Sequence, residues 1–219
     1  MLHFDISKSF EYENGFYLTS GVNRISKFAT HFDLFRRTMG LPGDIVECGV
    51  FKGASLSRWI KFRALLENPF SRQIIGFDTF SHFPEATFDE DRAIRDKFVE
   101  EAGDESISVA EMYRVLSELG LQQNIDLVEG DLLATLPQYI DSNPQLRISL
   151  LHIDVDLYEP TKIVLELLFP RVVKGGIVIL DDYGAFPGAN KAIEEYFGDS
   201  SLTIKKLPFS NAISFVEKC

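Results

Sequence analysis

The stretch LLHIDVDLYEPTKIVLELLFPRVVKGGIVILDDYG, residues 150–184, decides the fold. Its two apolar runs predict β-strands, and the segment between them predicts a helix. Each strand ends in a pair of aspartates, Asp154 and Asp156 in the first and Asp181 and Asp182 in the second. Ligands bind at the carboxyl ends of the strands in a parallel α/β sheet. The stretch therefore predicts a strand–helix–strand unit with its functional site at the aspartates.

These four carboxylates would share one small volume if the two strands are neighbours, because adjacent strands lie about 4.8 Å apart. Crowded carboxylates raise one another's pKa unless a cation neutralises them. Oxygen ligands of this kind suit Mg²⁺ or Ca²⁺. The pattern favours a metal-assisted active site, although each aspartate taken alone could be a turn former or a helix cap.

The rest of the chain alternates between short apolar runs and helical segments. Apolar runs without strict alternation are typical of strands covered on both faces, and the order of elements indicates a doubly wound, mostly parallel α/β fold. A helix at 190–199 and two strand-like runs, 202–208 and 211–217, predict an antiparallel C-terminal hairpin. We expect one domain, 1–219, with a helical N-terminal segment, 1–42. The other expected strands are 44–50, 73–80, 124–130, 148–155 and 175–182, with helices near 53–67, 106–119, 132–142 and 159–172.

The composition argues against several classes of protein. A net charge of −11 disfavours nucleic acid as a partner, because phosphate binding needs a basic face. No apolar run approaches the roughly 20 residues that span a bilayer, so no membrane partner is expected. The opening MLHFDISKSF lacks the features of a secretory signal, and Cys48 and Cys219 are too few for a disulfide framework. We expect a soluble cytoplasmic protein and leave assembly into homo-oligomers open.

The segment 81–106 is strongly acidic, with nine acidic and three basic residues. It has too few aliphatic side chains to be a core element. It is either a solvated insertion or a mobile lid, since long segments at this edge of the sheet commonly cover ligands. Its position directly after the second expected strand favours the lid.

The first expected strand runs into the turn ECGVFKGAS, residues 47–55. Gly49 and Gly53 would let the backbone approach a ligand, and the helix that starts near Ser55 offers free N–H groups. The turn has G-x-x-x-G instead of the G-x-G-x-x-G fingerprint that cradles a pyrophosphate. This difference argues against a nicotinamide or flavin dinucleotide.

Three acidic residues, Glu47, Asp78 and Asp131, lie at the ends of the first three expected strands. Asp78 is placed to grip ribose hydroxyls, and Asp131 to meet an adenine amine, although each could instead be a cap or a solvated strand end. Three acids without a phosphate loop fit a nucleoside that carries a positive charge and no phosphate. S-adenosylmethionine is such a ligand. Lys52 is then either a solvated loop cation or a contact for its methionine carboxylate.

The chain resembles the macrocin and mycinamicin sugar O-methyltransferase family over about residues 20–200. The resemblance rests on ECGVFKG, IIGFDTF, VEGDLLATLP and LHIDVDLYEPT…GGIVILDDYGAFPGANKAIEEYF. That family belongs to the class I methyltransferases that use S-adenosylmethionine. The resemblance implies a seven-stranded sheet with an antiparallel last strand. It also implies Mg²⁺-dependent methylation of a sugar hydroxyl on a nucleotide sugar, a glycan or a glycosylated natural product.

The resemblance also implies roles for single residues. Asp154, Asp181 and Asp182 match the metal ligands, and Asp156 matches the proposed general base, so Asp154 and Asp156 are the catalytic pair. The cofactor contacts implied are Glu47, Gly49, Asp78 and Asp131, with Gly53 and Ser55 in the same turn.

Two positions depart from the family pattern, with Val155 where a glycine is usual and His152 where a basic residue is frequent. His152 shares a strand face with Asp154 and Asp156, and is either a buried, satisfied histidine or an acid/base group. Two other functions stay open at this point. One is a methyltransferase for catechol-like diols, and the other is a non-catalytic nucleoside-binding domain.

Overall fold

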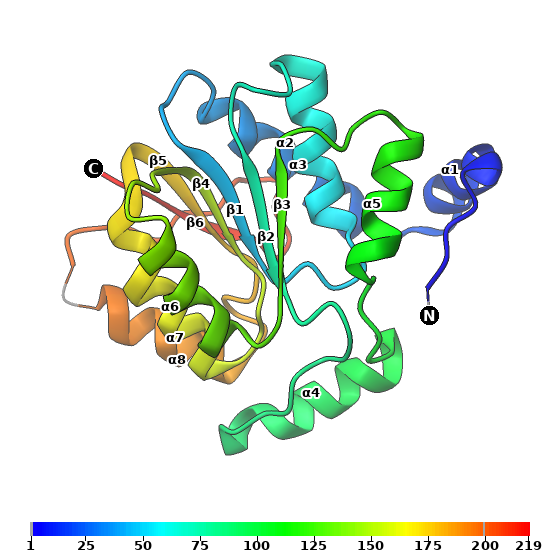
Figure 1. The fold of residues 1–219 in the computed structure, drawn as a ribbon. Helices are drawn as coiled ribbons and strands as arrows, with labels where there is room; N and C mark the ends of the chain where they lie inside the picture. The colour runs from blue at the N-terminus through cyan, green and yellow to red at the C-terminus, as the bar shows by residue number, and fades with distance from the viewer. Residues whose placement is uncertain (1, 199) are drawn as a thin grey trace.

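The computed structural model describes residues 2–198 and 200–219, and within these ranges six strands form one sheet (Figure 1). The strand order is β3-β2-β1-β4-β5-β6. The first five strands run parallel, and β6 runs antiparallel to β5. The strands are β1 (Asp44–Cys48), β2 (Ile74–Asp78), β3 (Ile125–Glu129), β4 (Ile148–Ile153), β5 (Val172–Leu180) and β6 (Ser214–Glu217). The predicted doubly wound, mostly parallel α/β fold is confirmed.

Helices cover both faces of the sheet, which explains the apolar runs of its strands. On one face, α2, α3 and α5 pack against alternate strand residues such as Ile45 and Leu150. On the other face, α6, α7 and α8 pack against their neighbours in sequence, Val46 and Leu151 (Figure 1). The helices are α1 (Ser9–Thr19), α2 (Val22–Arg37), α3 (Ala54–Leu66), α4 (Asp89–Ala102), α5 (Val109–Glu118), α6 (Leu132–Ser142), α7 (Tyr158–Leu168) and α8 (Pro187–Phe197), with short 3₁₀ helices at Ile6–Lys8 and Phe169–Arg171.

The expected count of seven strands is wrong. The run 202–208 pairs with β6 only at Lys205, which exchanges two backbone hydrogen bonds with Phe215. The chain then turns, with the Ser210 N–H donating to the Leu207 carbonyl, and Pro208 has no N–H to extend a ladder. The predicted hairpin is therefore one bridge beside a single strand. The last expected helix was placed at 190–199, and residue 199 lies outside the described residues.

The strand order creates a switch point at β1. The chain runs outward from β1 to β2 and β3 and then returns to β4 on the other side of β1. The register pairs Cys48 with Ile153, and the Asp154 N–H donates to the Cys48 carbonyl over 2.9 Å. Ligands bind in the crevice at such a point. The register thereby brings the 47–55 turn next to the aspartates that follow β4.

Helices α1 and α4 lie outside the two layers (Figure 1). α4 lies within the acidic segment 81–106, where we predicted no helix, and it lies near the carboxyl ends of the strands. α1 has no buried residue. In the described part of the chain, no helix is both long and apolar enough to cross a membrane.

Candidate active site

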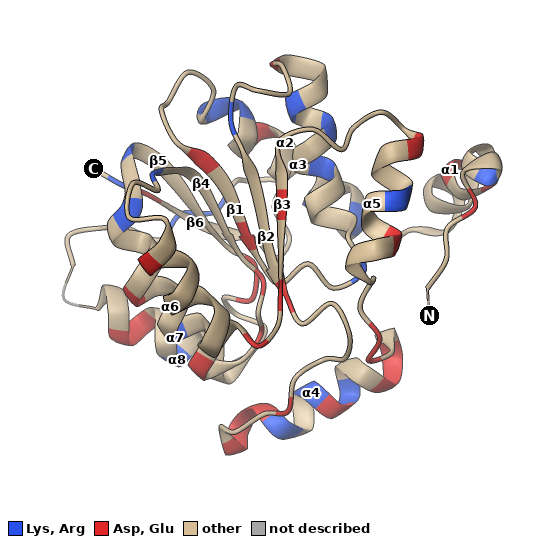
Figure 2. Ribbon diagram, viewed as in Figure 1, with Lys and Arg blue, Asp and Glu red and all other residues tan. Residues whose placement is uncertain are grey.

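A cavity of about 990 Å³ opens at the carboxyl ends of the parallel strands. Figure 2 shows acidic residues gathered where these strands end. The turn after β1, the ends of β2 and β3, the aspartates after β4 and β5, and segment 81–106 contribute to its walls. Eight of the ten residues predicted from the sequence line it: Gly49, Ser55, Asp78, Asp131, Asp154, Asp156, Asp181 and Asp182. The other two, Glu47 and Gly53, lie outside its lining.

Gly49 is required where the turn after β1 approaches the end of β4. Its φ of +92° lies in the left-handed region, and a Cβ there would lie 1.7 Å from the Asp154 carbonyl oxygen. Only glycine fits such a position without a backbone shift. The residue thus allows the turn after β1 to lie directly beside the aspartates that follow β4.

Asp78 holds the same turn in place. Its Oδ2 accepts hydrogen bonds from the Val50 and Phe51 N–H groups, both at 2.9 Å, and its Oδ1 accepts one from the Phe80 N–H at 2.7 Å. Thr79 Oγ1 also lies 3.4 Å from Oδ1, but its hydroxyl is closer to the His82 carbonyl, at 2.8 Å. A hydroxyl has one proton, so Oδ1 keeps a lone pair for a ligand hydroxyl. Asp78 shapes the turn and lines the cavity at once.

The other two predicted cofactor acids differ in their surroundings. Asp131 is exposed on the cavity rim and caps α6, accepting a hydrogen bond from the Leu133 N–H at 2.9 Å. Glu47 is fully buried, and its Oε1 accepts a hydrogen bond from the Ser55 hydroxyl at 2.7 Å. Its other oxygen lies 3.6 Å from His152 Nδ1. Glu47 therefore supports the turn from beneath.

Three of the four strand-end aspartates lie together. Carboxylate oxygens of Asp154, Asp156 and Asp182 lie within 4.8 Å of one another. Burial and the Asp154 charge raise the pKa of Asp156 to about 7, while burial and the Asp181 charge raise the pKa of Asp154 to about 6. Asp156 also has a φ of +61°, a strained backbone state that is typical of functional sites. A crowded set of hard oxygen donors fits a divalent cation such as Mg²⁺.

The fourth aspartate, Asp181, faces a lysine that the sequence analysis missed. Lys27 of α2 donates from Nζ to Asp181 Oδ2 over 2.6 Å and to Asp154 Oδ2 over 3.4 Å. Burial alone would raise the pKa of Asp181, but Lys27 and His152 hold it well below its usual range. The spacing of Lys27 and His31, one helical turn apart, was the available signal, because it places both on one face of the helix.

His152 is buried beneath the aspartates and does not line the cavity. Its Nε2 lies 3.5 Å from Asp181 Oδ1, and its Nδ1 faces Glu47. Burial lowers its pKa, but these two carboxylates outweigh burial and raise the pKa to about 9. This placement favours a structural, charge-paired histidine over an acid/base group.

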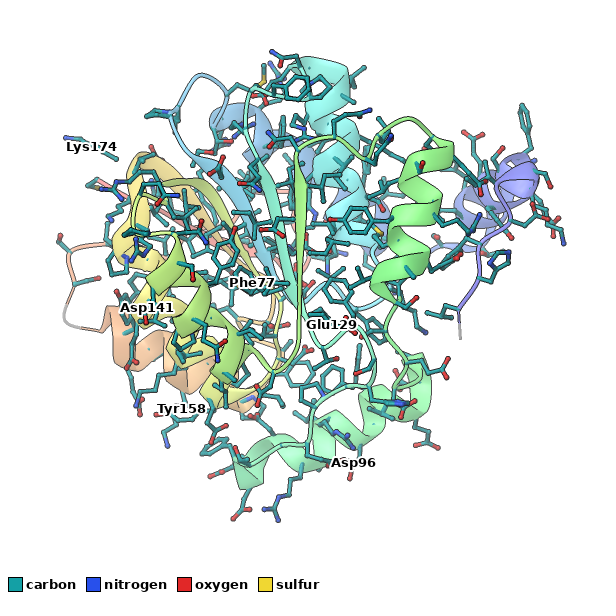
Figure 3. All side chains as sticks on the ribbon, viewed as in Figure 1. Phe77, Asp96, Glu129, Asp141, Tyr158 and Lys174 are labelled. Carbon is teal, nitrogen blue, oxygen red and sulfur yellow. The ribbon has the colours of Figure 1, made fainter. Side chains whose placement is uncertain are left out.

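Helix α4 is fastened over the cavity by a buried aspartate. Asp91 accepts hydrogen bonds from the Gly188 N–H at 2.7 Å and from the Tyr158 N–H at 3.1 Å, at the starts of α8 and α7. Figure 3 shows Tyr158 beside α4 and Asp96 pointing away from the molecule. Lys52, which also lines the cavity, donates to the Ala102 carbonyl at the other end of α4.

We expect Asp91→Ala to loosen α4 without unfolding the sheet. Two helix-start N–H groups, of Tyr158 and Gly188, would lose their acceptor, at about 1–3 kcal/mol for each that stays buried. Hydrogen exchange in 89–102 should become faster, and exchange in β1 and β4 should not change. Exposed Asp96→Ala on the same helix is the matched control. Equal exchange in both variants would show that Asp91 does not fasten the segment.

The chain belongs to the macrocin O-methyltransferase (TylF) family, whose model matches residues 16–207. It is 32% identical over 163 residues to the Streptomyces olivaceus 8-demethyl-8-(2,3-dimethoxy-alpha-L-rhamnosyl)-tetracenomycin-C 4'-O-methyltransferase, covering 73% of this chain and 59% of that protein. It is also 32% identical over 163 residues to the Micromonospora griseorubida mycinamicin III 3''-O-methyltransferase, covering 72% and 61%. The match thus spans about three fifths of these relatives.

Solved structures show the same architecture. The calicheamicin methyltransferase CalS11 superposes with a TM-score of 0.76 at 29% identity, covering 97% of this chain and 86% of that one. The O-methyltransferase NovP superposes with a TM-score of 0.73 at 23% identity, covering 89% and 80%. The fold is that of the class I methyltransferases, and the family predicted from the sequence is confirmed.

Proposed function

We propose that this protein is an S-adenosylmethionine-dependent O-methyltransferase that acts on a sugar hydroxyl. The observation that carries the proposal is the single cavity that brings together the turn after β1, Asp78 and the four strand-end aspartates. Relatives named for methylation of sugar-bearing natural products support it. A second solved structure of CalS11, 30% identical to this chain, is named a TDP-rhamnose 3'-O-methyltransferase. The acceptor class therefore includes nucleotide sugars and glycosylated natural products.

The nucleoside would lie along the ends of β1, β2 and β3. Gly49 leaves room for it, Asp78 presents a carboxylate to the ribose hydroxyls, and Asp131 lies at the rim on the adenine side. Ser55, at the start of α3, lines the same wall. Glu47 acts from behind this wall, because it binds Ser55 and does not line the cavity.

Mg²⁺ dependence is part of the proposal, and it rests on the crowded oxygen donors. We assign Asp154 and Asp182 as ligands, since Mg²⁺ is commonly held by one or two carboxylates and otherwise by water and substrate oxygens. When bound, the ion would polarise the acceptor hydroxyl and fix its direction. Asp156 takes the hydroxyl proton. The sequence also predicted Asp181 as a ligand, but its pairing with Lys27 favours a supporting role.

Positioning is the other contribution of the chain. Methyl transfer needs the acceptor oxygen in line with the sulfonium, and such alignment supplies several kcal/mol. Phe83 and Phe98 of the acidic segment line the cavity. With α4 fastened by Asp91, these side chains would exclude water from the acceptor and hold its apolar face.

The direct test is incubation with S-adenosylmethionine, Mg²⁺ and a panel of acceptors, read by mass spectrometry. The panel contains a nucleotide-linked deoxysugar, a free sugar, a glycosylated macrolide and a catechol. We expect a mass gain of one methyl group on a sugar. Methylation of the catechol alone would establish the diol alternative, and binding of cofactor without transfer to any member would favour a nucleoside-binding domain.

We expect Asp78→Ala to weaken S-adenosylhomocysteine binding by roughly 100-fold, the cost of losing charge-assisted contacts. Part of the loss would come through the turn, because the Val50 and Phe51 N–H groups lose their acceptor. Calorimetry measures the affinity, and Asp131→Ala is the comparison, with a smaller loss because Asp131 is exposed. An unchanged affinity in Asp78→Ala would place the cofactor elsewhere.

A further inference from the structure

Two arginines on the cavity wall have no acidic partner. Arg24 of α2 and Arg58 of α3 both line the cavity. Among the described residues, no carboxylate oxygen lies within ion-pair distance of either guanidinium. The side-chain partner of Arg58 is a neutral ring, with His31 Nδ1 at 3.4 Å from its Nη1. Arg24 forms no side-chain hydrogen bond within the described chain, although acidic residues outnumber basic ones by 33 to 22.

Both guanidinium groups line the same cavity and keep N–H donors that no carboxylate accepts. Burial lowers the pKa of Arg58, the Glu47 and Asp181 charges raise it, and the Arg24 charge lowers it. Their unused N–H groups can bind an added anion. The planar fork of arginine suits a carboxylate or a phosphate, which it can bind through two parallel hydrogen bonds. The wall therefore has the chemistry of an anion site.

The position of this pair indicates which anion it receives. Arg58 follows Ser55 by three residues in α3, so both lie on one face of the helix that begins at the cofactor turn. α2 and α3 cover one face of the sheet, and α7 and α8 cover the other. Asp91 of α4 binds the starts of α7 and α8. The pair thus lies on the α2–α3 side of the cavity, beside the cofactor turn.

Other cations near the cofactor turn are already engaged. Lys52 donates to the Ala102 carbonyl, and Lys27 is paired with Asp154 and Asp181. The amino-acid end of the cofactor carries a carboxylate that must be neutralised in a cavity otherwise rich in acids. Arg24 and Arg58 are the cavity-lining cations that donate to no carboxylate and no backbone carbonyl in the described structure.

We propose that Arg24 and Arg58 bind the α-carboxylate of the cofactor's methionine moiety. The inference rests on the proposed use of S-adenosylmethionine and assigns a part of that site for which the sequence offered Lys52 as one of two interpretations. The arginines supply affinity and hold the sulfonium end over the aspartates.

Calorimetry with two ligands tests the pair. S-adenosylhomocysteine has the carboxylate, whereas 5'-methylthioadenosine keeps the nucleoside and lacks the amino-acid end. Arg58→Gln and Arg24→Gln should each weaken S-adenosylhomocysteine binding by roughly 10- to 100-fold, as expected for a lost hydrogen bond to a charged group. Methylthioadenosine affinity should not change, which also shows that the variants are folded. Lys61→Gln, an exposed change on α3, should affect neither ligand.

Three results would overturn the inference. The first is unchanged S-adenosylhomocysteine affinity in both arginine variants, and the second is an equal loss for both ligands, which would indicate a damaged turn. The third comes from titrating thymidine diphosphate into each protein saturated with S-adenosylhomocysteine. If the arginine variants lost affinity for the diphosphate and kept their affinity for S-adenosylhomocysteine, the arginines would bind a phosphate of the acceptor. If the unaltered protein bound neither nucleoside, the proposed function itself would fail.

Discussion

Asp182→Asn should lower the rate of methyl transfer by about three orders of magnitude and leave S-adenosylhomocysteine affinity within about twofold. The rate estimate follows from losing a metal ligand that contributes several kcal/mol, at about 1.4 kcal/mol for each factor of ten. Asparagine keeps an oxygen that can accept the hydrogen bond from the Asp156 N–H, which Asp182 Oδ2 accepts over 2.8 Å. The fold should therefore persist, and the change removes mainly the negative charge.

The neighbouring variant, Asp181→Asn, separates the two assignments of the metal ligands. In the structure Asp182 lies with Asp154 and Asp156, whereas Asp181 faces Lys27 and the two buried histidines. We expect the rise in melting temperature caused by Mg²⁺ to disappear in Asp182→Asn and to persist in Asp181→Asn. Loss of the rise in both variants would restore Asp181 as a ligand. Full turnover in excess EDTA would remove the metal from the mechanism.

The sheet could be predicted because its strands carry their own signal. Both faces are covered, so runs such as IVIL and IIGF are continuously apolar, and the five parallel strands were placed correctly from this pattern. The strand expected at 202–208 had apolar residues too. A strand also needs a partner in register, and within this run only Lys205 has one. Local pattern cannot supply that long-range condition.

Segment 81–106 shows a second limit of pattern reading. Its dense charge and few aliphatic side chains predicted a solvated insertion or a lid without a helix, yet 14 of its residues form α4. The helix is held by Asp91, whose partners are N–H groups of Tyr158 and Gly188. A side chain at Gly188 would collide with the Asp91 carboxylate, since an added Cβ would lie 2.0 Å from Oδ2. Such a contact between residues 97 positions apart leaves no local trace in the sequence.

The candidate site was predictable to the level of strand ends and no further. Strand-end position alone brought Asp78, Asp154 and Asp182 to one cavity. It did not separate Asp181 from Asp182, which face different partners in the structure. The alternation of side chains along a strand could have indicated this, because adjacent residues point to opposite sides. It also gave no sign of which N-terminal cation would reach them. Lys27 comes from a helix 127 residues before Asp154, and only the packed α2 brings it there.

Lys27→Met should destabilise the protein in EDTA and make it more responsive to Mg²⁺. Removing one partner of a buried ion pair costs about 3–5 kcal/mol, and the partial exposure of Lys27 and Asp154 reduces this to about 2 kcal/mol. Melting temperature should then fall by roughly 4–8 °C in EDTA. Mg²⁺ would restore part of the loss, because it neutralises Asp154 in place of the ammonium. The rise caused by Mg²⁺ should be several degrees larger in the variant than in the unaltered protein, as measured by thermal denaturation with and without the ion. Exposed Lys61→Met should show neither effect, and an equal response to Mg²⁺ in all three proteins would mean that the ammonium and the ion do not share these acids.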